Sequence, residues 1–249
     1  MLLRRYRLVI LVLASRQPIF AKFRETWERY CHLYPEVKTH FVSGAGGSEG
    51  ALSSDLVYED SPESYPVNID KTLKAFKYID SVYDYDFLLR TNLSTFWDIP
   101  RLLNNLNTLP TENCYAGDGP FNHYVSGTDT IVNKDMITRG VELIDSDREF
   151  YESLVHSHGG RMSEDDAMGH IFHLRLGAPL ISLHDRKCFM EDFSFSMGPE
   201  ALQIEVKKRV ETAQSLNQDN FRIKNVPSER EGLDPLIMNM LYHYYYNSF

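Results

Sequence analysis

Hydrophobic residues in the first half of the chain alternate between two spacings, one typical of buried strands and one typical of helices. The continuous apolar run RLVILVLAS (residues 7–15) predicts a buried strand, and YDFLLRT (85–91) predicts another. Between them, apolar residues within 68–83 recur at i, i+3, i+4 and i+7, which predicts an amphipathic helix. Strands alternating with helices predict a mostly parallel sheet flanked by helices, an α/β fold.

The loops that follow the predicted parallel strands are expected to lie at one edge of this sheet. In parallel sheets, ligands bind beyond the carboxyl ends of the strands. We therefore expect the loops after Ala14, Glu59 and Thr91 to converge on one crevice.

The second half of the chain is less regular, with shorter predicted strands and helices. From Gly198 onward the pattern predicts a long charged helix and a final amphipathic helix. We find no linker of convincing length. The sequence therefore predicts one α/β domain over residues 1–197, with a helical C-terminal extension over 198–249 packed on it.

The charge and the cysteines limit the function classes. The net charge of −9, from 26 basic and 35 acidic residues, argues against a nucleic-acid-binding protein, although a few local cations suffice for a nucleotide. Three cysteines without C-x-x-C spacing predict neither a disulfide framework nor a zinc knuckle. This usage favours a reducing compartment.

The N-terminal segment has two interpretations. Its basic residues and the apolar run 8–14 resemble a short signal peptide, but the same run serves as the first buried strand. We favour the strand, because cleavage would remove it from the fold, and we find no later segment long and apolar enough to span a membrane. We therefore predict a soluble, cytoplasmic protein.

Three successive acids follow Ser163 in SEDDAMGHIF: Glu164, Asp165 and Asp166. Acids in the first turn of a helix commonly complement its dipole, with serine as the N-cap. A functional interpretation is a general base that takes a proton from a hydroxyl nucleophile. Sequence alone leaves both open.

Two further segments carry candidate binding residues. Arg24, in RETW, lies one to two helical turns beyond the first strand, where a guanidinium could reach a phosphate or a base. In SGTDT (126–130), small residues would let a sugar ring approach the backbone. As alternatives, Arg24 is a surface residue and 126–130 a simple turn.

The histidines show no recognised metal-binding spacing. His170 and His173 are three residues apart on a predicted helix, and His156 and His158 flank a loop. Without a pattern such as H-E-x-x-H we assign them to structure. His184, after a predicted strand, is the one weak metal candidate.

Five segments, in order over residues 7–175, resemble blocks of the β-1,3-galactosyltransferase, N-acetylglucosaminyltransferase and Fringe family. They are LVILVLAS with RETW, DLVYEDSPESYPVNIDKTLKAFKYI, YDFLLRTNLSTFWDIPRLL, YVSGTDTIVNKDMI and SEDDAMGHIF. The resemblance implies a GT-A fold, an inverting mechanism, a nucleotide-sugar donor and a glycan acceptor. Golgi members of the family have a membrane anchor and lumenal cysteines, which this sequence lacks. In this respect the sequence is similar to soluble relatives encoded by large algal DNA viruses.

Carried onto this sequence, the resemblance implies that Asp165 is the general base, with Glu164 and Asp166 as substitutes. It also implies a set of residues for the UDP-sugar donor. These are Ala14, Ser15, Arg16, Arg24, Asp60, Lys74, Arg90, Thr91, Asn92, Leu93, Ser94, Gly127 and Thr128. The donor sugar is left open among glucose, galactose, N-acetylglucosamine and xylose.

The departure from the family lies in the turn after Thr91. There the family has carboxylates for Mn²⁺ or Mg²⁺, whereas this chain has Asn92, Leu93 and Ser94. Amide and hydroxyl oxygens are poor substitutes for carboxylates around a hard dication. We therefore predict a metal-independent transferase. Candidate cations for the leaving diphosphate are Arg24, Lys74, Arg90 and the cluster His184-Asp185-Arg186-Lys187, and His184 with waters could instead hold a weak metal ion.

Two other functions fit the sequence less well. The lost carboxylates are also expected of a catalytically inactive relative that binds glycan or nucleotide. An unrelated α/β nucleotide enzyme would carry a P-loop, G-x-G-x-x-G or G-x-S-x-G segment in context, and we find none.

Overall fold

The computed structural model describes residues 3–15, 18–46, 55–61, 69–156 and 162–246. The chain forms two compact units, each with its own sheet. The sheet unit comprises Met1–Ser15, Tyr34–Thr91 and Pro110–Ser182. The C-terminal unit comprises Arg16–Leu33, Asn92–Leu109 and Leu183–Phe249. The expected boundary at residue 198 stays a prediction.

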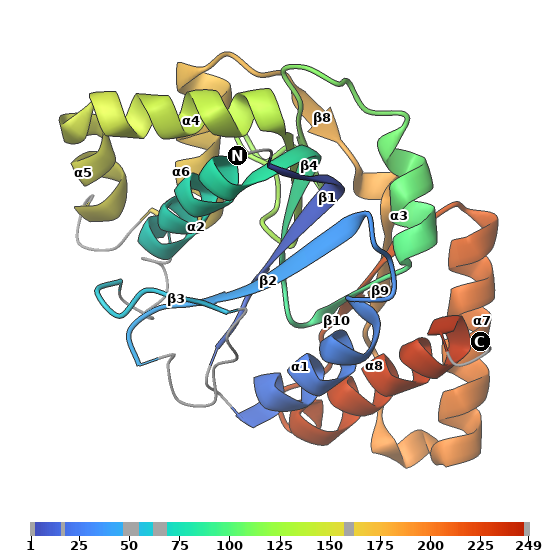
Figure 1. The fold of residues 1–249 in the computed structure, drawn as a ribbon. Helices are drawn as coiled ribbons and strands as arrows, with labels where there is room; N and C mark the ends of the chain where they lie inside the picture. The colour runs from blue at the N-terminus through green and yellow to red at the C-terminus, as the bar shows by residue number, and fades with distance from the viewer. Residues whose placement is uncertain (1–2, 16–17, 47–54, 62–68, 157–161, 247–249) are drawn as a thin grey trace. The chain divides into compact units, whose positions relative to one another are not determined.

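A seven-stranded sheet forms the centre of the sheet unit, in the order β3-β2-β1-β4-β7-β6-β8 (Figure 1). Its strands are β1 (Arg4–Leu13), β2 (Val37–Ser43), β3 (Leu56–Val57), β4 (Tyr83–Asn92), β6 (Tyr115–Gly117), β7 (Asp129–Asn133) and β8 (Leu180–Ser182). The pairs β1–β2, β2–β3 and β6–β8 are parallel, and β7 runs antiparallel to both β4 and β6. The predicted α/β class with a mostly parallel sheet is confirmed.

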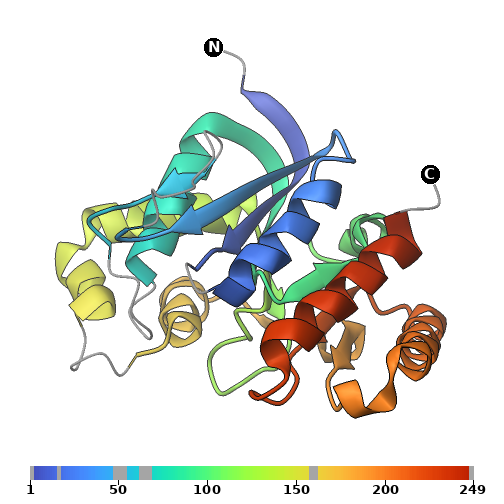
Figure 2. The same cartoon turned by 90° about the horizontal axis from the view of Figure 1, so that it is seen from below.

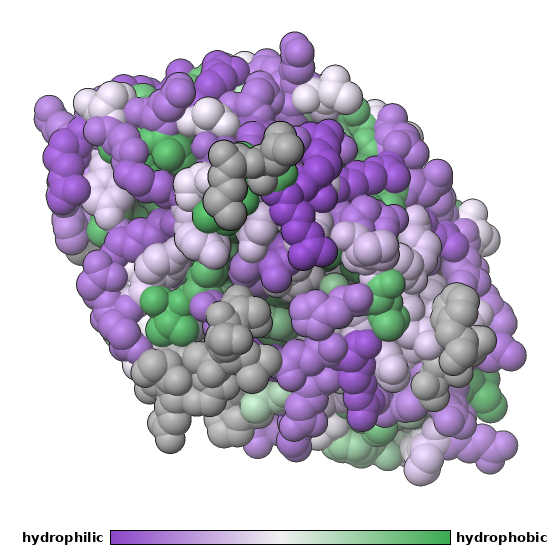
Figure 3. Space-filling model, in the orientation of Figure 1, coloured by the Kyte–Doolittle hydropathy of each residue, from purple (hydrophilic) through white to green (hydrophobic). Residues whose placement is uncertain are grey.

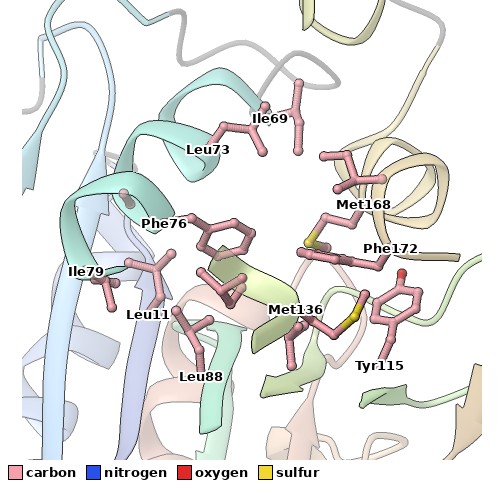
Figure 4. Close-up of a cluster of buried hydrophobic side chains, with 14 of the residues drawn as sticks. Leu11, Ile69, Leu73, Phe76, Ile79, Leu88, Tyr115, Met136, Met168 and Phe172 are labelled. Carbon is pink, nitrogen blue, oxygen red and sulfur yellow. The ribbon is translucent and has the colours of Figure 1, made fainter. Parts of the chain in front are cut away.

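The helices of the sheet unit share one hydrophobic core with strands β1 and β4. They are α2 (Ile69–Val82), α4 (Lys134–Ser146), α5 (Arg148–His156), α6 (Glu164–Gly169) and the π-helix η2 (His170–Arg175). Figure 4 shows Phe76 of α2 above Leu11 and Leu88 of the strands, with Met168 and Phe172 close by. These five side chains are almost completely buried, and Phe76 belongs to the apolar face predicted over residues 68–83.

The C-terminal unit contains a three-stranded sheet of order β5-β10-β9. Its elements are α1 (Pro18–Tyr30), β5 (Thr95–Trp97), α3 (Ile99–Leu106), η3 (His184–Arg186), β9 (Lys187–Met190), η4 (Phe195–Met197), α7 (Pro199–Ser215), β10 (Asn220–Ile223) and α8 (Arg230–Tyr246). Figure 2 shows α1 and α8 lying side by side. The two helices predicted beyond Gly198 are confirmed as α7 and α8, whereas the sequence did not indicate β5, β9 or β10.

Aromatic side chains hold the C-terminal unit together. The Tyr30 ring of α1 stacks on the Tyr246 ring of α8, with centroids 5.0 Å apart and planes 10° from parallel. The Tyr246 hydroxyl accepts a hydrogen bond from the Ile99 amide at 2.9 Å and donates one to the Trp97 carbonyl at 2.8 Å. Tyr246 therefore links α8 to three other elements, and its hydroxyl group is hydrogen-bonded although the ring is buried.

Polar residues predominate on the face drawn in Figure 3, with apolar residues in small separate patches. Among the described residues, no helix has the length and apolar character needed to cross a membrane.

Candidate functional site

Arg90, near the carboxyl end of β4, is the centre of a buried polar network in the sheet unit. The residue is only 5% exposed, and its Nε donates to Glu164 Oε1 at 3.1 Å. Its Nη2 donates to Glu164 Oε2, and its Nη1 donates to the Gly127 carbonyl and lies 4.0 Å from Asp165 Oδ1. Burial alone would lower the pKa of Arg90, but the Glu164 and Asp165 carboxylates raise it above its ordinary value. The guanidinium is therefore charged.

Glu164 is a structural partner of this network. It is 5% exposed and also accepts a hydrogen bond from Thr72 Oγ1 at 2.5 Å. Ser163 caps the same helix, since its Oγ accepts from the Asp166 amide at 3.2 Å. The capping interpretation therefore applies to Ser163. Glu164 has a role that neither interpretation included, the neutralisation of a buried cation, and the general base stays a prediction.

Asp165 lies beside this pair and is more accessible. Its side chain is 33% exposed, against 5% for that of Glu164. Gly127 packs against both partners, because a Cβ at residue 127 would lie 2.0 Å from Asp165 Oδ1 and 2.3 Å from Arg90 Nη1. The structure thus brings together three residues that the sequence placed in one site: Arg90, Gly127 and Asp165.

A methyl group at residue 127 should disturb this contact. We expect Gly127→Ala to lower the free energy of unfolding by about 1–3 kcal/mol, the usual cost of overpacking. Gly177→Ala is the control, because its methyl enters open space and only the positive φ of 74° opposes it. Its cost should be about 1 kcal/mol. Urea unfolding measures both, and a Gly127→Ala variant as stable as wild type would contradict the packing.

Threonine hydroxyls form hydrogen bonds within the 126–130 turn and between this turn and the end of β4. Thr91 Oγ1 donates to the Thr128 carbonyl at 2.7 Å, and Thr130 Oγ1 donates to the Ser126 carbonyl at 2.9 Å. The predicted donor residues Thr91 and Thr128 are therefore neighbours.

Ala14 and Ser15 follow β1 and are partly buried, with the Ala14 amide donating to the Val42 carbonyl at 2.9 Å. Arg16 lies outside the described residues.

Asp60 and Lys74, two further candidates, contact each other. Lys74 Nζ lies 2.7 Å from Asp60 Oδ2 and 2.8 Å from Asp70 Oδ2. Burial opposes the charge of Lys74, but the hydrogen bonds that it donates to both carboxylates raise its pKa. Two carboxylates already neutralise this cation, so Lys74 contributes little net positive charge to the site.

Asp70 provides a pH-dependent test of this network. Burial would raise its pKa, but hydrogen bonds from Lys74, Ser61 and Tyr151 outweigh burial and lower it. An acid whose pKa is lowered in the folded state stabilises the fold above its ordinary pKa, and this contribution disappears as the pH falls through the folded-state pKa.

We expect Asp70→Asn to lower the free energy of unfolding by about 1–3 kcal/mol at neutral pH. The difference from wild type should shrink below about pH 4, the ordinary range of the Asp pKa. Urea unfolding over this pH range measures it, with Asp60→Asn as the control because the Asp60 side chain is 76% exposed. A difference that persists unchanged in acid would contradict the expected pKa.

The remaining candidates belong to the C-terminal unit. Asn92 Oδ1 accepts a hydrogen bond from Arg222 Nη1 at 2.9 Å, and the same nitrogen donates to Ser94 Oγ. Leu93 is 1% exposed, and its carbonyl accepts from Trp27 Nε1 at 3.0 Å. Arg222, on β10, was missed by the sequence reasoning, since it lies 130 residues from Asn92 and in no recognised motif.

The Asn92-Leu93-Ser94 turn does not fit the divalent ion that the family resemblance implies. It has no carboxylate, and a guanidinium already binds the oxygens of Asn92 and Ser94. A metal dication at these atoms would be repelled by Arg222 at short range.

The other cations of this unit also have partners. Arg24 Nε pairs with Glu28 Oε1 at 2.7 Å on α1. Arg186 Nε donates at 2.9 Å to Asp219, which is fully buried. Arg186 is therefore a structural partner of Asp219. This pairing reduces the positive charge that the 184–187 segment can offer to a diphosphate, compared with what its sequence indicates. His184 is exposed.

The structure also groups three residues that the sequence reasoning did not connect: His123, Asp166 and His170. Each offers a possible metal ligand, and their ligand atoms lie within 4.8 Å of one another. The Asp166–His170 spacing of four residues was a visible signal, but His123 lies in another segment and nothing linked it to them.

The sequence matches no protein-family model and no curated protein. Among solved structures, the chain is similar to the apo-form glycosyltransferase GlyE of Streptococcus pneumoniae TIGR4, with a TM-score of 0.45 and 13% identity, covering 97% of this chain and 64% of that one. A second GlyE structure gives a TM-score of 0.43, 12% identity and the same coverage. A 4-diphosphocytidyl-2C-methyl-D-erythritol synthase gives 0.42 and 10% identity over 73% of this chain and 90% of that one.

The chain thus spans about 64% of the length of the GlyE chains. At these TM-scores and identities we base the functional proposal on the residues of the site. The resemblance to the β-1,3-galactosyltransferase and Fringe family stays a prediction.

Proposed function

We propose that the protein is an inverting glycosyltransferase that moves a sugar from a UDP-sugar to a hydroxyl group of a glycan acceptor. The observation that carries the proposal is a partly exposed carboxylate, Asp165, held at the start of α6 beside the buried Arg90–Glu164 pair. The five ordered sequence blocks supply the reaction class, and the position of Asp165 supplies the group that this reaction needs.

In the proposed step, the acceptor oxygen attacks the anomeric carbon from the face opposite the leaving nucleotide. A bond forms between that oxygen and the anomeric carbon, while the bond from the anomeric carbon to the β-phosphate oxygen breaks and UDP leaves with its electron pair. The hydroxyl proton passes to the Asp165 carboxylate. A base at this position contributes about 10²–10⁴-fold to the rate of such a step.

Arg90 and Glu164 act on this reaction through Asp165. The Arg90 guanidinium lies 4.0 Å from the Asp165 carboxylate, and this contact holds the carboxylate in position. Glu164 keeps the buried guanidinium in place and fixes the first turn of α6. We assign both as positioning residues.

The donor is proposed to bind next to the segments that contact Arg90 and Thr91. Gly127 packs against Arg90 and Asp165, and the Thr128 carbonyl accepts a hydrogen bond from Thr91; both residues remain candidates for contact with the donor sugar. Ala14, Ser15, Asp60 and Lys74 remain the candidates of the sheet unit for the nucleotide.

Calorimetry tests donor binding directly. Purified protein titrated with UDP should bind with a Kd of roughly 1 µM to 1 mM, the usual range for enzyme substrates. Titration with GDP is the control for the base and should give weaker binding. Absence of heat with UDP and with every UDP-sugar tested would overturn the proposed donor.

Chelation tests the metal independence that follows from the Asn92-Leu93-Ser94 turn. We expect turnover to survive EDTA, and added Mn²⁺ or Mg²⁺ to leave the rate unchanged, because Arg222 already occupies the oxygens of this turn. The rate of UDP release, measured before and after chelation, decides this. Loss of activity in EDTA that Mn²⁺ or Mg²⁺ restores would contradict the prediction.

A second candidate function is a nucleotide- or glycan-binding module without turnover. It is favoured by the missing carboxylates and by the engagement of Asn92 with Arg222. Calorimetric binding of UDP combined with no detectable turnover in the wild-type protein would support it, whereas turnover that Asp165→Ala abolishes while binding persists would exclude it.

A further inference from the structure

Three metal-ligating side chains meet at one place in the sheet unit, outside the proposed donor site. Asp166 lies on α6, and His170 follows one helical turn later at the start of the π-helix η2. His123 comes from the segment between β6 and β7. We call His123, Asp166 and His170 the histidine–aspartate cluster.

The distances within the cluster suit a bound ion. His123 Nε2 lies 2.6 Å from Asp166 Oδ1, and His170 Nε2 lies 4.0 Å from the same oxygen. The centroids of the His123 and His170 imidazole rings are 4.8 Å apart, and the ring planes are nearly perpendicular, at 81°. Ligands bonded to one dication at about 2.0–2.2 Å lie roughly 3–4 Å from each other. Small side-chain rotations therefore bring all three ligand atoms into one coordination sphere.

The His123–Asp166 contact is not an ordinary hydrogen bond. The buried Nε2 atom of His123 makes no hydrogen bond within the part of the chain that the structure describes, because the Asp166 oxygen 2.6 Å away is not aligned for one. The Nε2 atom and the carboxylate oxygen are therefore both available to a shared ion.

Gly169 brings the cluster together. A Cβ at this residue would lie 2.5 Å from the His123 carbonyl oxygen and 2.6 Å from Tyr124 Cβ. The segment carrying His123 therefore rests directly on the helix backbone between the other two ligands. Any larger residue at 169 would push His123 away from Asp166 and His170.

The helix changes its geometry at the cluster. Residues 170–175 form a π-helix, an uncommon conformation that appears mostly as short segments and often at functional sites. The wider turn begins at His170 itself, so the ligand stands at the junction of the two helix types. This observation is independent of the side-chain distances.

The ligand set indicates which ion is bound. Imidazole nitrogens suit late first-row ions such as Zn²⁺ and Co²⁺, whereas Mg²⁺ and Ca²⁺ prefer oxygen ligands. Side-chain exposures of 27%, 28% and 34% for His123, Asp166 and His170 leave part of the cluster within reach of water, although His123 Nε2 itself is buried. Three protein ligands with an open position are also the pattern of zinc sites that keep an exchangeable ligand.

We propose that the histidine–aspartate cluster binds one zinc-like divalent ion through two imidazoles and one carboxylate, with water completing its coordination. This site is separate from the Asn92-Leu93-Ser94 turn, where the family resemblance places a metal. It does not depend on the proposed transfer reaction, because metal binding is measured on the protein directly.

The experiment uses the full chain without an affinity tag, stripped of metal with a chelator. Titration with Zn²⁺ is followed by calorimetry, and titration with Co²⁺ by visible absorption. We expect one ion per chain, cobalt bands typical of nitrogen and oxygen ligands, and no comparable binding of Mg²⁺. Zinc should also raise the thermal unfolding midpoint, because it binds the folded state.

Variants separate the cluster from other ligands. His123→Gln and His170→Gln should each weaken zinc binding by at least about 10–100-fold, the loss found even when outer-shell partners are removed. His184→Ala and Cys188→Ser are matched controls that change an exposed histidine and the least buried of the three thiols, and both should bind as wild type does. Circular dichroism checks that each variant is folded.

Absence of stoichiometric zinc binding by the wild-type protein would overturn the proposal. So would retention of full affinity in both His123→Gln and His170→Gln, or an equal loss in His184→Ala or Cys188→Ser. If His170→Gln fails to fold, His123→Gln alone decides, since His123 lies outside the regular helices and strands. Failure of UDP binding alongside intact zinc binding would overturn only the proposed function.

Discussion

Replacing Asp165 with asparagine is expected to lower turnover by about 10²–10⁴-fold, the usual contribution of a general base. The substitution keeps the shape of the side chain and removes its ability to take a proton. Because the side chain is partly exposed and asparagine has the same shape, the fold should remain intact. Initial rates of UDP release at saturating donor and acceptor measure the change, and calorimetry should show UDP bound as tightly as by wild type.

Asp145→Asn is the matched control for this experiment. Asp145 is on α4, half exposed and paired with Lys77, and it has no part in the proposed chemistry. Its turnover should equal that of wild type. An Asp165→Asn enzyme with activity within about 3-fold of wild type would remove Asp165 from the mechanism, since a base contributes far more than that.

Replacing Arg90 with methionine is expected to lower the free energy of unfolding by about 3–5 kcal/mol, the usual effect of breaking a buried ion pair. Glu164 would be left 5% exposed without its cation, and the Gly127 carbonyl would lose a donor. Urea unfolding followed by circular dichroism measures the difference. Because Arg90 also positions Asp165, turnover should fall in any fraction that folds.

Two variants test the cause of this destabilisation. Arg5→Met removes an arginine paired with Asp84 and Asp86 at the surface, where its side chain is 57% exposed, and it should cost less than about 1 kcal/mol. In the double variant Arg90→Met with Glu164→Met, no charge is left unpaired, so most of the lost stability should return. A double variant less stable than Arg90→Met alone would contradict the ion-pair explanation.

Elements with a long apolar run or a clear helical period could be predicted from the sequence. Strand β1 and helix α2 are examples, because β1 contains a continuous buried run within its 10 residues and the apolar residues of α2 keep a helical period over 14. Strands β5, β9 and β10 were missed, since three or four residues are too short to show a period and they pair only with segments distant in the chain. The antiparallel direction of β7 was likewise not indicated by its own residues.

The site was predictable where its residues are neighbours in sequence. The acids after Ser163 were located, and capping explains part of the run, but the Arg90–Glu164 pair joins residues 74 apart. The engagement of Asn92 by Arg222 spans 130 residues. Contacts of this kind depend on the tertiary fold, and no local pattern of charge or hydrophobicity contains them. The histidine–aspartate cluster was missed for the same reason.

Transfer of sugar from UDP-sugars, followed by proton NMR, tests the central claim most directly. Purified protein is incubated in EDTA with UDP-glucose, UDP-galactose, UDP-N-acetylglucosamine or UDP-xylose and a panel of glycan acceptors. We predict that at least one α-linked donor is consumed and gives UDP together with a β-linked product, and that Asp165→Asn largely abolishes the reaction. Consumption of none of the donors, or a product that retains the donor's configuration, would contradict the account.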